Sequence, residues 1–353
     1  MPSFDSEHRP AVKGGLLALS AAMLFGASTP LVQRMGAGLG PFVTAALLYA
    51  GAAALGVLTR QPVGREAAVR RSDLPRLLWM ALFGAAVGPV ALAWGLQHTS
   101  GTSASLMLTL EAVFTALFAR ALYAEVMDRR VWIAVILLAA GGAVLIADRG
   151  DAGDAQSWGL LAVIAATVAW GVDNTLSRAV AERDPAQVVV AKSALGMLLT
   201  LMLSRFAGEP LPSWQQAISL LLIGATGYGL SLRMYLLAQR AFGAARTGSV
   251  FAFAPFIGAA IAVLMGDSSL GWGTLVGGLL MVAGIVVHLG ERHEHQHLHP
   301  ALDHEHAHRH DDGHHDHAHD PMPTGSHSHR HTHAATRHTH AHVPNLHHQH
   351  GHE

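Results

Sequence analysis

Cysteine is absent from the 353 residues of this sequence. Its absence excludes disulfide bridges and thiolate ligands for a metal. Charge is also scarce, because charged residues make up 13% of the chain and hydrophobic residues 51%. No nucleotide-binding motif is present, so nothing supports an ATP-driven pump. We expect no nucleic-acid partner.

Long apolar runs take the place of these missing features, and they recur from Gly14 to Leu289. A helix of about 20 apolar residues crosses the roughly 30 Å of bilayer hydrocarbon. The first run is too long for the hydrophobic region of a signal peptide, and many others follow it. An all-α membrane protein is therefore predicted, which excludes a soluble enzyme. The ten expected spans cover residues 14–33, 40–58, 75–97, 102–123, 131–147, 157–178, 185–205, 215–238, 246–266 and 271–289.

The distribution of arginine predicts how the spans are oriented, since cytoplasmic loops are rich in Lys and Arg. Arginines gather in the loops after spans two, four, six and eight, and five lie between Arg60 and Arg76. The alternate loops carry few, and the one at 148–154 is acidic. Both termini are expected in the cytoplasm, with the protein embedded in a bacterial inner membrane.

The two halves of the chain resemble each other. GLLALSAA at 15–22 matches GLLAVIAA at 159–166, and Pro41 matches Pro185 at the start of the next span. Each repeat holds five helices, an odd number, so the two copies must be inverted in the membrane. Inverted repeats place a substrate site near the midplane between the halves. The predicted segments are a cytoplasmic N-terminus (1–13), two five-helix repeats (14–147 and 157–289) and a tail (290–353).

Three ionisable residues lie deepest in the spans: Glu111, Asp173 and Lys192. A charge at this depth costs at least about 2.5–3.5 kcal/mol on insertion scales, so it is usually paired or functional. Asp173 and Lys192 flank one short turn and should lie roughly 8–10 Å from the same membrane face. We expect them to meet, either as a structural ion pair or as a substrate or proton site. Asn174 is a further candidate for this site.

Glu111 is the most isolated acid of the chain. Desolvation favours its neutral form unless a cation is near. A carboxyl in that position could carry a proton in exchange for a solute. The alternative is a protonated or hydrogen-bonded group with a structural role.

Several segments are similar to one known family. They are SLMLTLEAVF around Glu111, WGVDN at 170–174, and FAFAPFIGAAIAVLMGD with Pro255 and Asp267. They resemble the EamA-type transporters of the drug/metabolite transporter (DMT) superfamily, over about residues 14–289. The family often has proline after the mid-helix glutamate, where this chain has Ala112. The resemblance implies a polytopic transporter of small solutes, frequently an exporter, built from two EamA-like repeats.

The tail differs in composition from the rest of the chain. It holds 23 of the 26 histidines, many in an H-x-H pattern, and almost no large apolar residues. It cannot bury a core, so we expect it to be disordered. Neutral imidazole suits Zn²⁺, Ni²⁺, Co²⁺ or Cu²⁺, and the alternative is a low-complexity tail without a role. The candidate ligands are His293, His295, His297, His299, His304, His306, His308, His310, His314, His315, His317 and His319.

Three functions remain open at this point. The first is proton-coupled export of a small organic metabolite or drug. The second is efflux of a transition metal (Ni, Co or Zn), with the tail as metal collector. The third is a metal-buffering or sensing membrane protein that transports nothing. The spans contain no cysteine and no deep histidine, which favours the first. No cofactor is required; the expected partners are the lipid bilayer and a small-molecule solute, and transition-metal ions and a second copy in a homodimer are further candidates.

Overall fold

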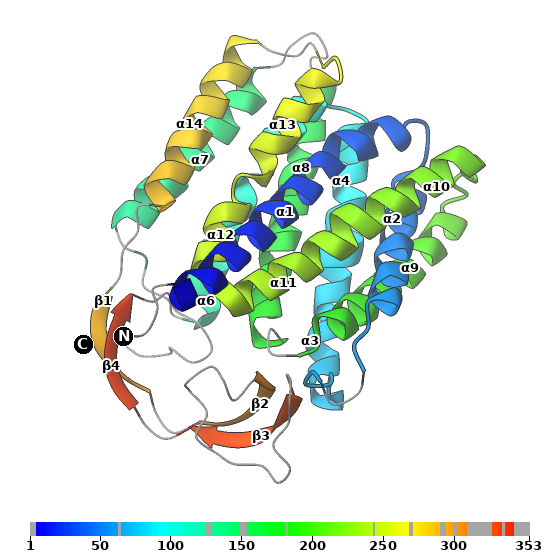
Figure 1. The fold of residues 1–353 in the computed structure, drawn as a ribbon. Helices are drawn as coiled ribbons and strands as arrows, with labels where there is room; N and C mark the ends of the chain where they lie inside the picture. The colour runs from blue at the N-terminus through cyan, green and yellow to red at the C-terminus, as the bar shows by residue number, and fades with distance from the viewer. Residues whose placement is uncertain are drawn as a thin grey trace.

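The computed structural model is a bundle of helices followed by short strands (Figure 1). It describes residues 5–62, 65–123, 127, 129–148, 154–180, 183–242, 244–267, 271–289, 294–299, 302–308, 327–333 and 336–341.

The first repeat contains the spans one to five. They are formed by α1 (Asp5–Met35); α2 (Pro41–Leu58); η1 (Arg71–Asp73), α3 (Leu74–Met80), η2 (Ala81–Val87) and α4 (Gly88–Leu96); α5 (Gly101–Met107) and α6 (Leu110–Tyr123); and α7 (Arg129–Ala147).

The second repeat contains the spans six to ten. They are formed by α8 (Asp154–Ser177), ending in η3 (Arg178–Val180); α9 (Pro185–Phe206); α10 (Trp214–Ile223), η4 (Gly224–Leu230) and α11 (Ser231–Phe242); α12 (Ala244–Phe251) and α13 (Ala254–Leu264); and α14 (Trp272–Leu289). Among the described residues, 8 helical runs are long and apolar enough to cross a membrane, and two shorter apolar helices lie at spans nine and ten. The prediction of an all-α membrane protein is confirmed.

Matched prolines begin matched helices. Pro41 is the first residue of α2 and Pro185 the first of α9. Proline suits this position because a helix has no internal acceptor for its first N–H groups. Asp184 precedes α9, and its side chain accepts a hydrogen bond from the backbone N–H of Ala186 at 2.9 Å. These two spans therefore start where the repeat predicts.

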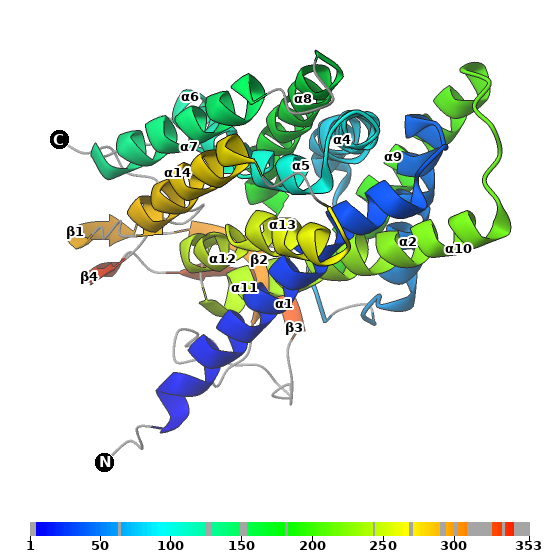
Figure 2. The same ribbon diagram turned by 90° about the horizontal axis from the view of Figure 1, so that it is seen from above.

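The packing of the helices follows the repeat. α2 packs along α9, and α7 packs along α14, so that matched spans pair with each other. α1 packs along α11, and α8 packs along α4, which is the same contact with the two halves exchanged. Figure 1 and Figure 2 both show α7 beside α14 at one edge of the bundle. This pattern is what two repeats related by a twofold axis produce.

Four spans are irregular, at matching places in the two repeats. Spans three and eight contain the π-helical segments η2 and η4. The expected continuous helices at 102–123 and 246–266 are each two helices, interrupted at 108–109 and 252–253. Pro255 is the second residue of α13. Proline has no backbone N–H, and at this position an N–H group would have no acceptor within the helix. Irregular backbone at membrane depth is tolerated where it is buried in protein or lines a water-filled space, as in transporters.

Acids of the second repeat cap helices of the first. Glu209 follows α9 and accepts hydrogen bonds from the backbone N–H groups of Phe42 (3.1 Å) and Val43 (2.7 Å) at the start of α2. Asp267 follows α13 and accepts one from the backbone N–H of Thr102 (2.8 Å) at the start of α5. A carboxylate there satisfies free N–H groups and complements the helix dipole. These contacts tie the two halves together at one face of the bundle.

The described part of the tail forms four strands, where we expect disorder. β1 (Glu294–His299) pairs antiparallel with β4 (Thr336–Ala341), and β2 (Leu302–His308) with β3 (His327–His333). The H-x-H pattern has the two-residue period of a strand, although a lone two-stranded sheet is marginal in water. The candidate ligands His295, His297, His299, His304, His306 and His308 lie in β1 and β2, whereas His293, His310, His314, His315, His317 and His319 lie outside the described residues.

Candidate functional site

Asp173 and Lys192 form a buried ion pair, as the sequence predicts. Lys192 Nζ donates a hydrogen bond to Asp173 Oδ2, and each side chain is 5% exposed. The pair joins α8 to α9 on either side of their connecting turn. The second carboxylate oxygen, Asp173 Oδ1, is buried and has no hydrogen-bond partner among the described residues.

Gly84 of η2 is the residue against which this carboxylate packs. A Cβ atom at Gly84 would lie 2.3 Å from Asp173 Cγ, so only glycine leaves room there. The Gly84 carbonyl oxygen accepts hydrogen bonds from Tyr49 Oη at 2.5 Å and Trp170 Nε1 at 3.0 Å. Side chains from spans two, six and seven therefore converge on the π-helical segment of span three.

Glu111 lies at the start of α6, immediately after the interruption at 108–109. Its Oε1 atom accepts a hydrogen bond of 2.6 Å from Asn174 Nδ2 of α8. Both side chains are half-buried, unlike the ion pair. The four residues that the sequence singles out therefore lie together: Asn174, which bonds Glu111, follows Asp173 directly in the chain, and Asp173 bonds Lys192.

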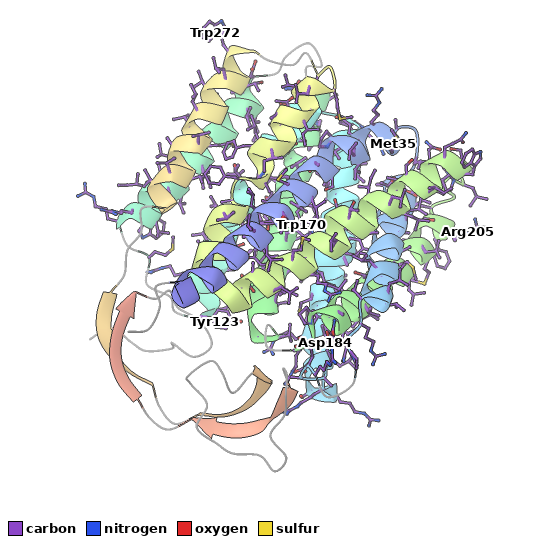
Figure 3. All side chains as sticks on the ribbon, in the orientation of Figure 1. Met35, Tyr123, Trp170, Asp184, Arg205 and Trp272 are labelled. Carbon is purple, nitrogen blue, oxygen red and sulfur yellow. The ribbon has the colours of Figure 1, made fainter. Side chains whose placement is uncertain are left out.

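Six aromatic residues meet where the halves join, and we call them the aromatic cluster. They are Phe25, Tyr49, Trp170, Tyr228, Tyr235 and Phe251. The ring of Phe25 lies 5.8 Å from that of Trp170, 5.9 Å from that of Tyr228 and 5.5 Å from that of Phe251. Tyr235 extends the cluster with a ring distance of 5.0 Å to Phe251. Figure 3 places Trp170 in the middle of the bundle.

Our sequence reasoning missed the aromatic cluster. Two signals pointed to it. Phe25 and Trp170 occupy matched places in the two repeats, each followed by glycine. The chain has only 4 tyrosines, and Tyr49 and Tyr228 lie inside spans rather than at their ends, where the interfacial belt would place them.

Paired helical halves, interrupted helices and buried charges at their junction define the architecture of a membrane transporter. The sequence model of the EamA-like transporter family matches residues 12–147 and 157–290. The chain belongs to the EamA-like transporter family. The two matches confirm the two-repeat architecture, and transporters of this family in general need no cofactor.

Two similar proteins agree with this assignment. A protein of Methanothermobacter thermautotrophicus named "Uncharacterized transporter" is 24% identical over 294 residues, which cover 78% of this chain and 85% of that protein. A solved structure titled "Crystal structure of protein" has a TM-score of 0.57 and 18% identity, covering 78% of this chain and 94% of the other. The second likeness shows the fold alone.

Metal ligands do not gather in the part of the chain that the structure describes. No group of three or more His, Asp or Glu residues there could hold a metal ion. Metal binding by the histidines of the tail stays a prediction.

Proposed function

We propose that the protein is a secondary transporter that exports a small organic metabolite or drug in exchange for protons. The observation that carries this proposal is the placement of Glu111. Its carboxyl group is half-buried in the middle of a span, at the junction of the two halves, and bonds the neutral amide of Asn174. A carboxyl so placed can take up a proton or attract a solute.

The exchange follows from competition for this one group. A proton on Glu111 removes the charge that would attract the solute, so the two occupy the site in turn. Rocking of the two repeats against each other would expose the site to one membrane face and then the other. The interruption in span four immediately precedes Glu111, and span nine is interrupted at the matching place. Both interruptions would give the halves places to move. Because bacterial proton gradients point inward, the exchanged solute moves outward.

The test uses purified protein in lipid vesicles with a pH-sensitive dye inside. A growth screen of a deletion strain against amino acids, drugs and metals first selects the solutes to add. Glu111→Gln is nearly isosteric but cannot ionise, so we expect normal expression and no solute flux in response to an imposed pH gradient. Glu66→Gln, in the loop after α2, is the matched control and should behave as the wild type. Gradient-driven flux in Glu111→Gln would reject the coupling role.

The histidines of the tail favour a second candidate, efflux of Ni²⁺, Co²⁺ or Zn²⁺ with the tail as collector. The two candidates separate on metal-containing plates. If metal is the cargo, truncation after Gly290 and Glu111→Gln should both raise sensitivity. If an organic solute is the cargo, neither should. If the protein only buffers metal, truncation should raise sensitivity and Glu111→Gln should not.

A further inference from the structure

Two polar segments from different halves of the chain are bonded to each other at one face of the bundle. The first is the arginine-rich loop after α2, and the second is the turn that connects α8 to α9. The backbone N–H of Asp184 donates to the Ala67 carbonyl oxygen at 2.8 Å. The backbone N–H of Val69 donates to Gln187 Oε1 at 3.1 Å. We call this face the arginine-rich face, and these bonds tie the two halves together there.

An ion pair between Asp73 and Arg183 completes this contact. Arg183 Nε donates to Asp73 Oδ2 at 2.9 Å, and the two side chains are 15% and 8% exposed. The same oxygen accepts a hydrogen bond of 2.9 Å from the backbone N–H of Arg70, which fixes the carboxylate within its own loop. Solvent screens a pair with so little exposure less than it screens a surface pair. The ion pair therefore contributes to holding the loop on the turn.

A small apolar cluster, separate from the main core, lies between this ion pair and the candidate site. We call it the apolar layer, and its buried members are Leu77, Met80, Val180 and Val188, each at most 3% exposed. They belong to spans three, six and seven, which also carry Gly84, Asp173 and Lys192. Leu77 precedes Gly84 by seven residues and Val180 follows Asp173 by seven, which is about 10 Å along a helix. The apolar layer thus separates the site from the arginine-rich face.

The opposite face has a contact between the same elements with the two halves exchanged. There the loop after α9 meets the start of α2, because Glu209 accepts hydrogen bonds from the backbone N–H groups of Phe42 and Val43. Figure 3 places Met35 and Asp184 at opposite ends of the bundle. Alternating access requires the contacts at one face to break while those at the other hold. The two faces differ in chemistry, since one is held by an ion pair and the other by a helix cap.

We propose that Asp73 and Arg183 are the gate of the arginine-rich face, and that their ion pair keeps the apolar layer closed over the candidate site. The proposal rests on the proposed transport function and names residues that control access to its site. When the pair breaks, the loop separates from the turn, and water and solute reach the site from this face.

The experiment uses thiol labelling, because the natural chain has no cysteine that would give a background. Val180→Cys places one thiol in the apolar layer, and Leu39→Cys places one just before α2 at the opposite face; the two natural side chains are 3% and 5% exposed. The full chain is held in lipid nanodiscs. The rate of reaction with a charged maleimide measures how often water reaches each thiol. Val188→Cys is the second reporter in the apolar layer and replaces Val180→Cys if that variant does not fold.

Arg183→Gln and Asp73→Asn each remove one charge of the gate. We expect either change to raise the labelling rate of Val180→Cys by at least about fivefold, which is within the range of coupling between contacting charged groups. Both changes together should raise it no further, since they break the same ion pair. Arg183→Lys keeps the charge and should retain most of the protection. The labelling rate of Leu39→Cys should not rise in any of these variants.

Arg65→Gln is the matched control, because it removes an exposed arginine from the same loop, and it should label as the unaltered reporter does. Size-exclusion profiles and tryptophan fluorescence establish that each variant is folded. An unchanged labelling rate of Val180→Cys in Arg183→Gln overturns the inference. A rate that rises equally at both reporters also overturns it, because a purely structural ion pair would loosen the whole bundle when broken.

Labelling needs no transported solute, so failure of the gate and failure of the transport function are distinguishable. Proton-coupled flux in vesicles, together with unchanged labelling in Arg183→Gln, would support transport and contradict the gate. The expected labelling pattern without flux of any solute would support control of access by Asp73 and Arg183 and contradict transport.

Discussion

The buried pair of Asp173 and Lys192 gives the sharpest test of the structure. Lys192→Met keeps the length of the side chain and removes its charge, which leaves the Asp173 carboxylate buried at 5% exposure without a cation. Removing one partner of such a pair costs about 3–5 kcal/mol, because the remaining charge is uncompensated. At roughly 2–4 °C per kcal/mol for domains of comparable size, the unfolding temperature should fall by about 6–20 °C.

The double variant, Asp173→Asn with Lys192→Met, removes both charges. Replacing a buried pair by neutral groups is often nearly neutral, so the double variant should be more stable than either single one, with a coupling energy of about 2–3 kcal/mol. The loss in Lys192→Met should also shrink as the pH falls, since a proton on Asp173 removes the unpaired charge.

The assay must suit this chain. The absence of cysteine rules out thiol-reactive dyes, but the 7 tryptophans report unfolding by intrinsic fluorescence in detergent. All four proteins of the cycle are measured side by side. Strictly additive losses, with no recovery in the double variant, would refute the pairing of Asp173 with Lys192.

Three further predictions concern Gly84, Glu209 and the histidine-rich tail. Gly84→Ala would place a Cβ atom 2.3 Å from Asp173 Cγ and should lower the free energy of unfolding by about 1–3 kcal/mol, measured by thermal unfolding. The control is Gly278→Ala, whose Cβ atom would have its nearest neighbour at 3.4 Å and which should lower it much less. Equal losses in the two variants would contradict the contact between Gly84 and Asp173. Glu209→Gln weakens the charged cap on α2 and should lower stability by about 0.3–1 kcal/mol, with less effect in high salt if the helix dipole is the cause. Truncation after Gly290 should leave the helical content intact and reduce metal binding, measured by calorimetry, to near none. The full chain should lose metal affinity below about pH 6, because protonated imidazole cannot bind a metal ion. Metal binding retained by the truncated chain would show that the ligands lie elsewhere.

The sequence by itself determined the all-helical membrane architecture, the repeat and the pairing of Asp173 with Lys192. Each of these depends on one-dimensional properties. The bilayer demands about 20 apolar residues per helix, whatever its neighbours are. Two charges that flank a short turn between antiparallel helices lie at the same depth, and this can be predicted without knowing where the other spans lie. Prolines at 41 and 185 mark helix starts for a local reason as well.

Only the tertiary structure decided which groups meet across the bundle. Nothing in the apolar pattern of span four predicts its interruption at 108–109, because neither glycine nor proline stands at Leu108 and Thr109 to mark a break. The contact of Glu111 with Asn174 and the gathering of the aromatic cluster depend on how each helix is rotated about its axis. That rotation is set by close approaches at small residues such as Gly84, which form only when the two halves pack together.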